Sequence, residues 1–183
     1  MEKWMEWDKK QRIEDFEARV PPVFSGELVE YMVQNGFFTC PSSTGEDGRH
    51  GAFEGGNYWH SRMVSMLIRE YTEKMGITWE RPESPEVIGW LHDLCKMDEY
   101  ERAGRAIYTR RKDTPLQGHG VKSAIIALSR MYLTDEEIYC ICWHMGAFTG
   151  ESKWDAYTKA VKKYPNILWV HQADMVASQV KGV

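Results

Sequence analysis

Hydrophobic residues recur along most of this chain at spacings of three and four, which is the period of an amphipathic α-helix. The clearest stretch runs over residues 58–74 and is closed by Gly76, and its apolar positions are Met63, Val64, Leu67, Ile68 and Tyr71. Similar patterns predict further helices over residues 3–19, 25–34, 84–94, 119–131, 135–145, 152–163 and 166–180. No alternation of β-branched and polar residues with hairpin turns is evident, so the sequence predicts an all-α fold.

Local end signals support several of these helices. Ser25 is a favourable N-cap for the helix over 25–34. Ser84 followed by Pro85 predicts another start, with the serine as N-cap and the proline in the first helical position. Thr134 with Glu137 three residues later has the spacing of a capping box, which predicts a helix beginning at residue 135.

Two stretches lack a helical pattern. Residues 39–56 are rich in Gly, Ser and Asp and read as a long loop, and loops of that length inside a domain are usually functional or disordered. Residues 102–112 form a connector without an acidic residue, whose basic side chains are Arg102, Arg105, Arg110, Arg111 and Lys112. We expect residues 1–45 to be an N-terminal helical extension and linker, and residues 46–183 to form the main domain.

Composition narrows the class of protein. A chain of 183 residues, with 43% hydrophobic and 27% charged residues, fits one globular domain with a sizeable core. Its net charge of −4 argues against a protein that coats polynucleotides or membrane surfaces, because such binding depends on clustered basic charge. A small anionic substrate in a local basic pocket remains compatible with this net charge.

No apolar run has the length of a signal peptide or membrane span, so we expect a cytoplasmic protein. Its cysteines show no CxxC spacing and are expected to be reduced and mostly buried: Cys40, Cys95, Cys140 and Cys142.

Residues of the types that bind metal ions recur in the predicted helices or at their edges. They are His60, His92, Asp93, His119, His144 and Asp174. Four imidazoles and two carboxylates are enough ligands for two transition-metal ions. A bound metal ion lowers the pKa of water from about 15.7 to about 7, which provides hydroxide at neutral pH. The alternative is a set of unrelated structural histidines.

The adjacent pair His92 and Asp93 is central to this hypothesis. On a helix, neighbouring side chains diverge by about 100°, so the two could serve one centre only if it lies over the helix edge. Lys96 follows four residues after His92, on the same helical face, where its ammonium group could bind a phosphate oxygen.

The order of these residues resembles the H…HD…D pattern of the HD-domain superfamily of metal-dependent phosphohydrolases. The extra histidines resemble its binuclear branch, and the similarity covers about residues 50–178. The similar segments are HGAFEGGNYWHS (50–61), WLHDLCK (90–96), QGHGVKS (117–123), ICWHMG (141–146) and HQADMVAS (171–178). The resemblance implies an HD-type helical bundle. It also implies one ion held by His60, His92, Asp93 and Asp174, and a second, bridged by Asp93, on His119 and His144. Manganese, iron, cobalt or nickel is expected, with magnesium or zinc as alternatives.

The resemblance also implies hydrolysis of a nucleotide or nucleotide-like phosphate ester by a hydroxide that bridges the metals. Asp93 and Lys96 are the expected catalytic residues, and the expected substrate contacts are Lys96, Lys122, Arg110, Arg111 and His50. The rival interpretation is a mixed-valent di-iron oxygenase that cleaves a C–C or C–P bond, because the same ligands suit iron. A third is a non-catalytic nucleotide sensor. The expected partner is a small phosphorylated molecule, without membrane or stable polynucleotide binding, and a homo-oligomer is compatible with the sequence.

Two further residues near the ligands have open roles. Cys95 should point away from the ligands and pack in the core. His171 lies one turn before Asp174 and could orient that carboxylate, or take no part in the site. The tryptophans beside the ligands are expected to pack in the core: Trp59, Trp90 and Trp143.

Overall fold

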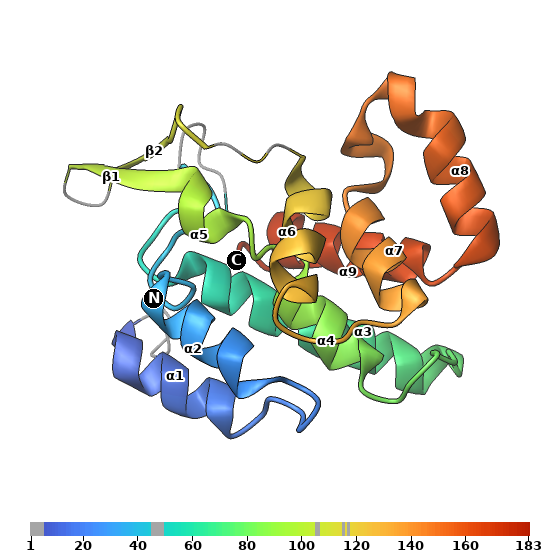
Figure 1. Cartoon of the computed structure of the whole chain (residues 1–183), viewed down its shortest axis with the longest axis horizontal. Coiled ribbons are helices and arrows are strands. Elements are labelled where there is room, and N and C mark those ends of the chain that lie inside the picture. The colour runs from blue at the N-terminus through green and yellow to red at the C-terminus, as the bar shows by residue number, and fades with distance from the viewer. Residues whose placement is uncertain (1–5, 45–49, 105–106, 115, 117) are drawn as a thin grey trace.

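Helices make up most of the protein in the computed structural model, which describes residues 6–44, 50–104, 107–114, 116 and 118–183 (Figure 1). They are α1 (Lys9–Glu17), α2 (Gly26–Gln34), α3 (Gly56–Met75), α4 (Ser84–Leu91), α5 (Lys96–Glu99), α6 (His119–Leu128), α7 (Asp135–Trp143), α8 (Trp154–Lys163) and α9 (Ile167–Gln179). Two short 3₁₀ turns, η3 (Gly146–Thr149) and η4 (Glu151–Lys153), precede α8. The all-α prediction is confirmed. None of the described helices is long and apolar enough to span a membrane.

Side-chain caps mark the starts of α1, α2 and α7. The capping box of Thr134 and Glu137 is present at the start of α7, and Ser25 caps α2, as predicted. The first helix is shorter than predicted, because a capping box between Asp8 and Gln11 starts it at Lys9; predicted residues 3–5 lie outside the described chain. Ser84 is not the N-cap of α4. Its hydroxyl instead donates to Glu137 Oε1 at 2.8 Å.

The helix predicted over 84–94 ends early. Beyond Leu91, the main-chain amides of residues 94 and 96–98 bond to carbonyls three residues back, which tightens the chain into turns before α5 begins at Lys96. His92 and Asp93 therefore occupy a tight turn rather than a helix interior. This turn changes the directions of the side chains that follow Asp93.

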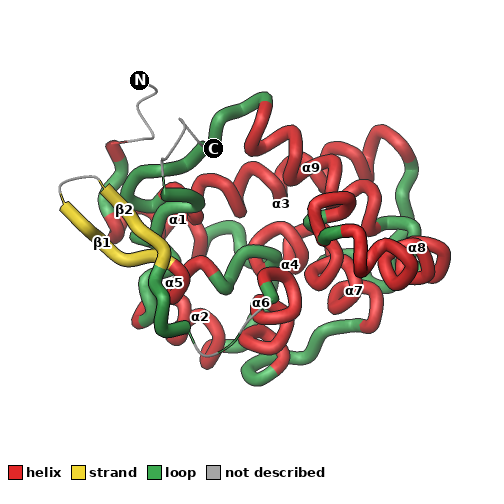
Figure 2. Tube along the Cα trace, turned by 90° about the horizontal axis from the view of Figure 1, so that it is seen from above, coloured by secondary structure: helices red, strands yellow, loops and turns green. Residues whose placement is uncertain are grey.

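The predicted basic connector is in part a β-hairpin, which the sequence analysis missed. Strands β1 (Tyr100–Gly104) and β2 (Ile107–Arg110) pair antiparallel, with Tyr100 opposite Arg110. Tyr100 and Tyr108 are buried and anchor the hairpin at the edge of the molecule, at the opposite end from α8 (Figure 2). Arg105 lies outside the described residues.

The N-terminal helices share the core of the main helical body. Phe16 packs its ring edge-on against Trp90, with the ring centroids 4.9 Å apart. Phe37, Phe38 and Tyr58 belong to the same aromatic cluster. Such ring pairs add to the free energy gained from burying apolar area. The boundary at residue 45 stays a prediction. The tryptophans pack in or against this core as expected: Trp59, Trp90 and Trp143.

Two glycines let the ligand-bearing helices approach closely. α3 packs against α4 and α9, and α6 packs against α7. A Cβ at Gly89 of α4 would lie 2.5 Å from the Ser65 nitrogen of α3, and one at Gly120 of α6 would lie 2.6 Å from the Cys142 carbonyl oxygen of α7. The first approach brings His92 beside His60, and the second brings His119 beside His144.

Candidate metal centre

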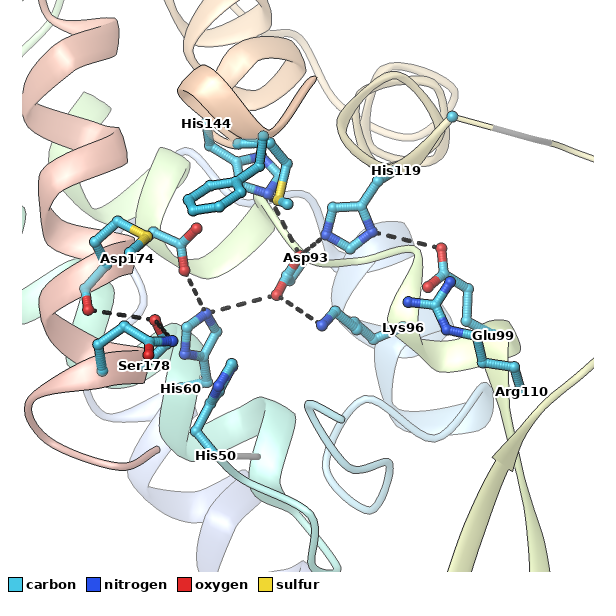
Figure 3. Close-up of a pocket in the computed structure, with 15 residues that line it drawn as sticks. His50, His60, Asp93, Lys96, Glu99, Arg110, His119, His144, Asp174 and Ser178 are labelled. Carbon is cyan, nitrogen blue, oxygen red and sulfur yellow. Dashed lines mark hydrogen bonds and ion pairs between the residues drawn. The ribbon is translucent and has the colours of Figure 1, made fainter. Parts of the chain in front are cut away.

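The six predicted ligands converge on one site. Figure 3 shows His60, Asp93, His119, His144 and Asp174, and His92 lies beside His60. They come from α3, from the turns that follow α4 and α7, from the first residue of α6, and from α9. His60, His92, Asp93 and His144 are buried, and only His119 and Asp174 are partly exposed. Buried polar groups need hydrogen-bond or metal partners, so each of these side chains must find a partner within the site.

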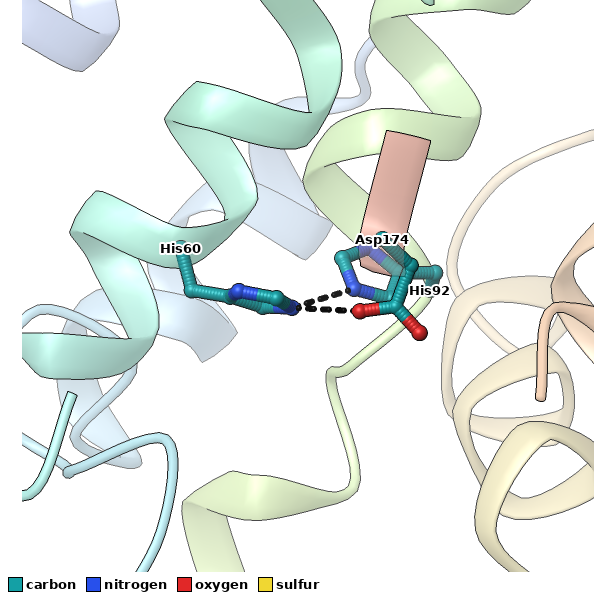
Figure 4. Close-up of side chains that lie close together, drawn as sticks. All are labelled: His60, His92 and Asp174. Carbon is teal, nitrogen blue, oxygen red and sulfur yellow. Dashed lines mark hydrogen bonds and ion pairs between the residues drawn. The ribbon is translucent and has the colours of Figure 1, made fainter. Parts of the chain in front are cut away.

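His60, His92 and Asp174 form the first group (Figure 4). The Nε2 atom of His60 lies 3.1 Å from Nε2 of His92 and 3.1 Å from Oδ1 of Asp174. The Nδ1 atoms point the other way: that of His60 lies 2.9 Å from the Val183 carbonyl oxygen, and that of His92 lies 2.9 Å from the Gly89 carbonyl oxygen.

These hydrogen bonds fix the tautomers. A carbonyl oxygen only accepts, so the proton of each neutral ring lies on Nδ1 and the lone pair on Nε2. Two such lone pairs would face each other at 3.1 Å between His60 and His92. A proton or a metal ion between them removes this repulsion. Backbone hydrogen bonding of the second ring nitrogen is also how proteins orient histidines that bind metals.

Asp93 lies between this group and a second pair of histidines. Its Oδ2 lies 3.6 Å from His60 Nε2 and 3.5 Å from His92 Nε2. Its Oδ1 lies 2.6 Å from His119 Nε2 and 3.6 Å from His144 Nε2. Each carboxylate oxygen thus faces a different pair of imidazoles.

His144 supplies a test of whether a metal ion fits the second group. Its Nδ1 donates to the Ile141 carbonyl oxygen at 2.7 Å, which leaves the lone pair on Nε2. That buried Nε2 has no hydrogen-bond partner within the described chain. His92, Asp93 and His144 also lie close enough together to hold an ion. The residues present therefore fit a metal ion at this position.

His119 differs from the other three because its Nδ1 faces side chains. Nδ1 lies 3.1 Å from the Cys95 sulfur and 3.6 Å from Oε1 of Glu99. The expectation that Cys95 points away from the ligands is wrong, because the tight turn after Leu91 directs its buried thiol toward His119. Asp93, Cys95 and His119 form a third group that could hold a metal ion.

The electrostatics prepare several of these groups for binding a cation. Burial lowers the pKa of His144 to about 3, with a smaller contribution from the charge of His92, and burial also lowers the pKa of His92. Burial opposes ionisation of Asp93, but Lys96 and the neighbouring histidines hold its pKa well below the usual value. At neutral pH His92 and His144 are therefore neutral imidazoles, and Asp93 is an ionised carboxylate.

The other two histidines are shifted the opposite way. Burial alone would lower the pKa of His60, but the hydrogen bond and charge of Asp174 raise it above its ordinary value. Burial likewise opposes protonation of His119, and the charge of Asp93 outweighs it, so its pKa is well raised. Both imidazoles thus attract positive charge, either as protons or as a metal ion.

A cavity of about 630 Å³ opens onto the ligands. Of the predicted substrate contacts, Lys96, Arg110 and His50 line it. Lys96 lies 3.5 Å from Oδ2 of Asp93 and donates to the Ser42 carbonyl, so it accompanies Asp93 rather than sharing a face with His92. Burial lowers the pKa of His50 to about 4, which makes it a neutral hydrogen-bonding group.

The structure does not bring Lys122 and Arg111 to this cavity. Lys122 is buried and its ammonium group lies 2.5 Å from Asp98, because its position on α6 directs it toward α5. Arg111 follows the end of β2 and pairs with Asp113 at 3.3 Å. Both were predicted as substrate contacts, and among the described residues that line the cavity neither is present.

Of the two roles left open for His171, orienting Asp174 is not the one observed, because no hydrogen bond joins the two among the described residues. Its ring makes a 2.8 Å hydrogen bond through Nδ1 to the carbonyl oxygen of His144, so it holds the turn that carries a ligand.

Sequence reasoning missed several side chains of the cavity. They are Glu99, Met145, Phe148, Met175, Ser178 and Gln179. Met145 and Met175 each follow a predicted ligand directly, and that position was the available signal. Glu99 gave no such signal, because its approach to His119 depends on the turn before α5.

Comparisons with known proteins found no relative of this chain. No protein-family model, no curated protein and no solved structure matches the chain.

Proposed function

We propose that this protein is a binuclear metal-dependent phosphohydrolase of the HD type, acting on a nucleotide or nucleotide-like phosphate ester. The observation that carries the proposal is the position of Asp93, whose two carboxylate oxygens face two separate pairs of buried imidazoles. A carboxylate in that position suits two cations side by side, which are typically about 3.5–4 Å apart in two-metal hydrolases.

The ligands divide between two positions. His60, His92 and Asp174 would hold one divalent ion together with Asp93, and His119 and His144 would complete the second. Imidazole and carboxylate ligands suit manganese, iron, cobalt or nickel. When bound, such ions supply hydroxide at neutral pH and neutralise charge that develops on phosphoryl oxygens.

Two cations of the chain support a phosphate as substrate. Burial would lower the pKa of Lys96, but the charge of Asp93 outweighs burial and raises it, so Lys96 is protonated at neutral pH. Its ammonium group lies within 3.5 Å of Asp93, where it can donate to a phosphate oxygen held beside that carboxylate. Arg110 lines the same cavity, contacts the ring of Tyr100, and has no ion-pair partner in the part of the chain that is described. An arginine in this state can bind phosphate through two parallel hydrogen bonds.

The test is hydrolysis without oxygen. Nucleoside mono-, di- and triphosphates and cyclic dinucleotides, incubated anaerobically with Mn²⁺, Co²⁺ or Fe²⁺, are expected to release phosphate or a shortened nucleotide from at least one member. Asp93→Asn should abolish this turnover while the helical circular dichroism persists. Lys96→Ala should lower kcat/KM by about tenfold or more, as expected for loss of a charge-assisted hydrogen bond of about 1.5–3 kcal/mol.

Neighbouring arginines give a matched control. Arg110→Ala should raise KM, because Arg110 lines the cavity, whereas Arg111→Ala removes the same charge one residue away and should change KM by less than about twofold. Absence of hydrolysis across the panel would overturn the proposal. Turnover that requires O₂ would identify the rival oxygenase chemistry, which the same ligand types permit.

A further inference from the structure

The two ends of the cavity differ in chemistry. Arg110 and Lys96 lie at one end, and Ser178 lies at the other, beside Asp174 (Figure 3). Apart from Asp174, the side chains that Met145, η3 and α9 place on this wall are apolar or uncharged: Met145, Phe148, Met175, Ser178 and Gln179. Arg110 and Lys96 at the basic end can bind a phosphate group, so the uncharged wall faces another part of the substrate.

Phe148 is the unusual member of this wall. Its side chain is 66% exposed although it is a large apolar residue, and it is not part of the described hydrophobic core. Its ring has an aromatic contact with His171, at 6.2 Å between centroids. An exposed aromatic ring that lines a ligand cavity offers a flat apolar surface for a second ring.

His171 holds the turn that carries Phe148 in place. Gly146 has a φ of +53°, and a Cβ at this position would lie 2.6 Å from the His171 ring. His171 in turn bonds to the His144 carbonyl oxygen at 2.8 Å. The same turn therefore fixes both a predicted metal ligand and Phe148, which sets the ring at a defined place relative to the ligands.

Polar groups on the same wall could contact the edge of a stacked ring. The Gln179 amide nitrogen lies 3.4 Å from the Ser178 hydroxyl, and that hydroxyl lies 3.3 Å from the Met175 carbonyl oxygen. Both hydrogen bonds are long, so a ligand that offers better geometry can replace them. Amide and hydroxyl groups match the mixed donors and acceptors at the edge of a nucleobase.

We infer that the substrate is a nucleoside phosphate, whose base stacks on Phe148 while its phosphate lies at Asp93 and Lys96. The inference rests on the proposed phosphohydrolase function and makes Phe148 a determinant of substrate specificity. The cavity volume of about 630 Å³ lies in the range of small-molecule sites, which is about 300–1,000 Å³.

The kinetic test compares each of the four ribonucleoside 5′-monophosphates with ribose 5-phosphate, which has the same phosphate and sugar but no base. The wild-type protein should prefer at least one nucleotide over ribose 5-phosphate in kcat/KM. Phe148→Ala should reduce this preference about tenfold, equivalent to about 1.4 kcal/mol, mainly through KM, and Phe148→Tyr should retain most of it. Tyr132→Ala removes an aromatic ring that is 74% exposed but does not line the cavity, and it should leave the preference unchanged.

A binding measurement separates failure of this inference from failure of the proposed function. Titration calorimetry of the protein with adenosine, guanosine, cytidine and uridine needs no catalysis, because a nucleoside carries no phosphate ester. At least one nucleoside should bind, and Phe148→Ala should raise its Kd about tenfold. Hydrolysis without preference for a base, together with no nucleoside binding, would overturn the inference and leave the phosphohydrolase standing. Nucleoside binding that depends on Phe148, without hydrolysis of any ester, would support the base site and reject the reaction.

Discussion

Metal binding should stabilise the fold by an amount that can be calculated in advance. The ligands of the candidate centre come from separate helices, so the unfolded chain does not hold them together. An ion that binds only the folded state stabilises it by about 2.7 kcal/mol when its free concentration is 100 times Kd. The Nε2 atoms of His60 and His92 face each other at 3.1 Å, and an ion bound by both relieves that contact.

This free energy converts into a measurable change in Tm. The entropy of unfolding is about 2.1 cal/mol/K per residue, which gives about 0.38 kcal/mol/K for 183 residues. One ion at 100 times its Kd should therefore raise Tm by about 7 °C. Scanning calorimetry after chelator treatment, with and without Mn²⁺, Fe²⁺, Co²⁺, Ni²⁺ or Zn²⁺, measures this shift.

Two histidine variants make the test specific. His144→Ala removes the buried imidazole whose Nε2 has no hydrogen-bond partner among the described residues, and should reduce the bound metal from two ions to one per chain. His50→Ala removes an imidazole from the same cavity but outside the three ligand groups, and should keep both ions. The reasoning fails if no metal raises Tm, or if the two variants bind equal amounts of metal.

Two predictions concern the scaffold. Gly89→Ala should lower the free energy of unfolding by about 1–3 kcal/mol in urea titrations, because a Cβ there meets the Ser65 backbone. Gly26→Ala is the control and should leave the free energy of unfolding unchanged, because a Cβ added there meets nothing within 4 Å. Equal effects of the two substitutions would contradict this account. Burial opposes ionisation of Asp15, but its hydrogen bond from Tyr58 and two nearby arginines lower its pKa below 3.8. Its stabilisation is therefore present above about pH 4 and lost as the pH falls through the lowered pKa. Asp15→Asn should cost about 1.5–3 kcal/mol at pH 7 and clearly less at pH 3, and a pH-independent cost would refute this.

Local sequence determined most helices and pointed to the candidate metal ligands. The capping box of Thr134 and Glu137 and the stop at Gly76 act over three to five residues, so they could be recognised without knowledge of the fold. The six predicted ligands also lie together in the structure. Membership of the HD superfamily and the reaction remain predictions.

Only the tertiary structure decided which side chains meet and which do not. Lys122 and Arg110 both looked like phosphate ligands by charge and position, yet Lys122 pairs with Asp98 and Arg110 lines the cavity. Cys95 faces His119 because the chain tightens after Leu91, and the hairpin forms where no strand was predicted. The contacts of Lys122 with Asp98 and of Cys95 with His119 join residues distant in sequence, and spacing along one segment contains no information about the surface that another segment presents to it.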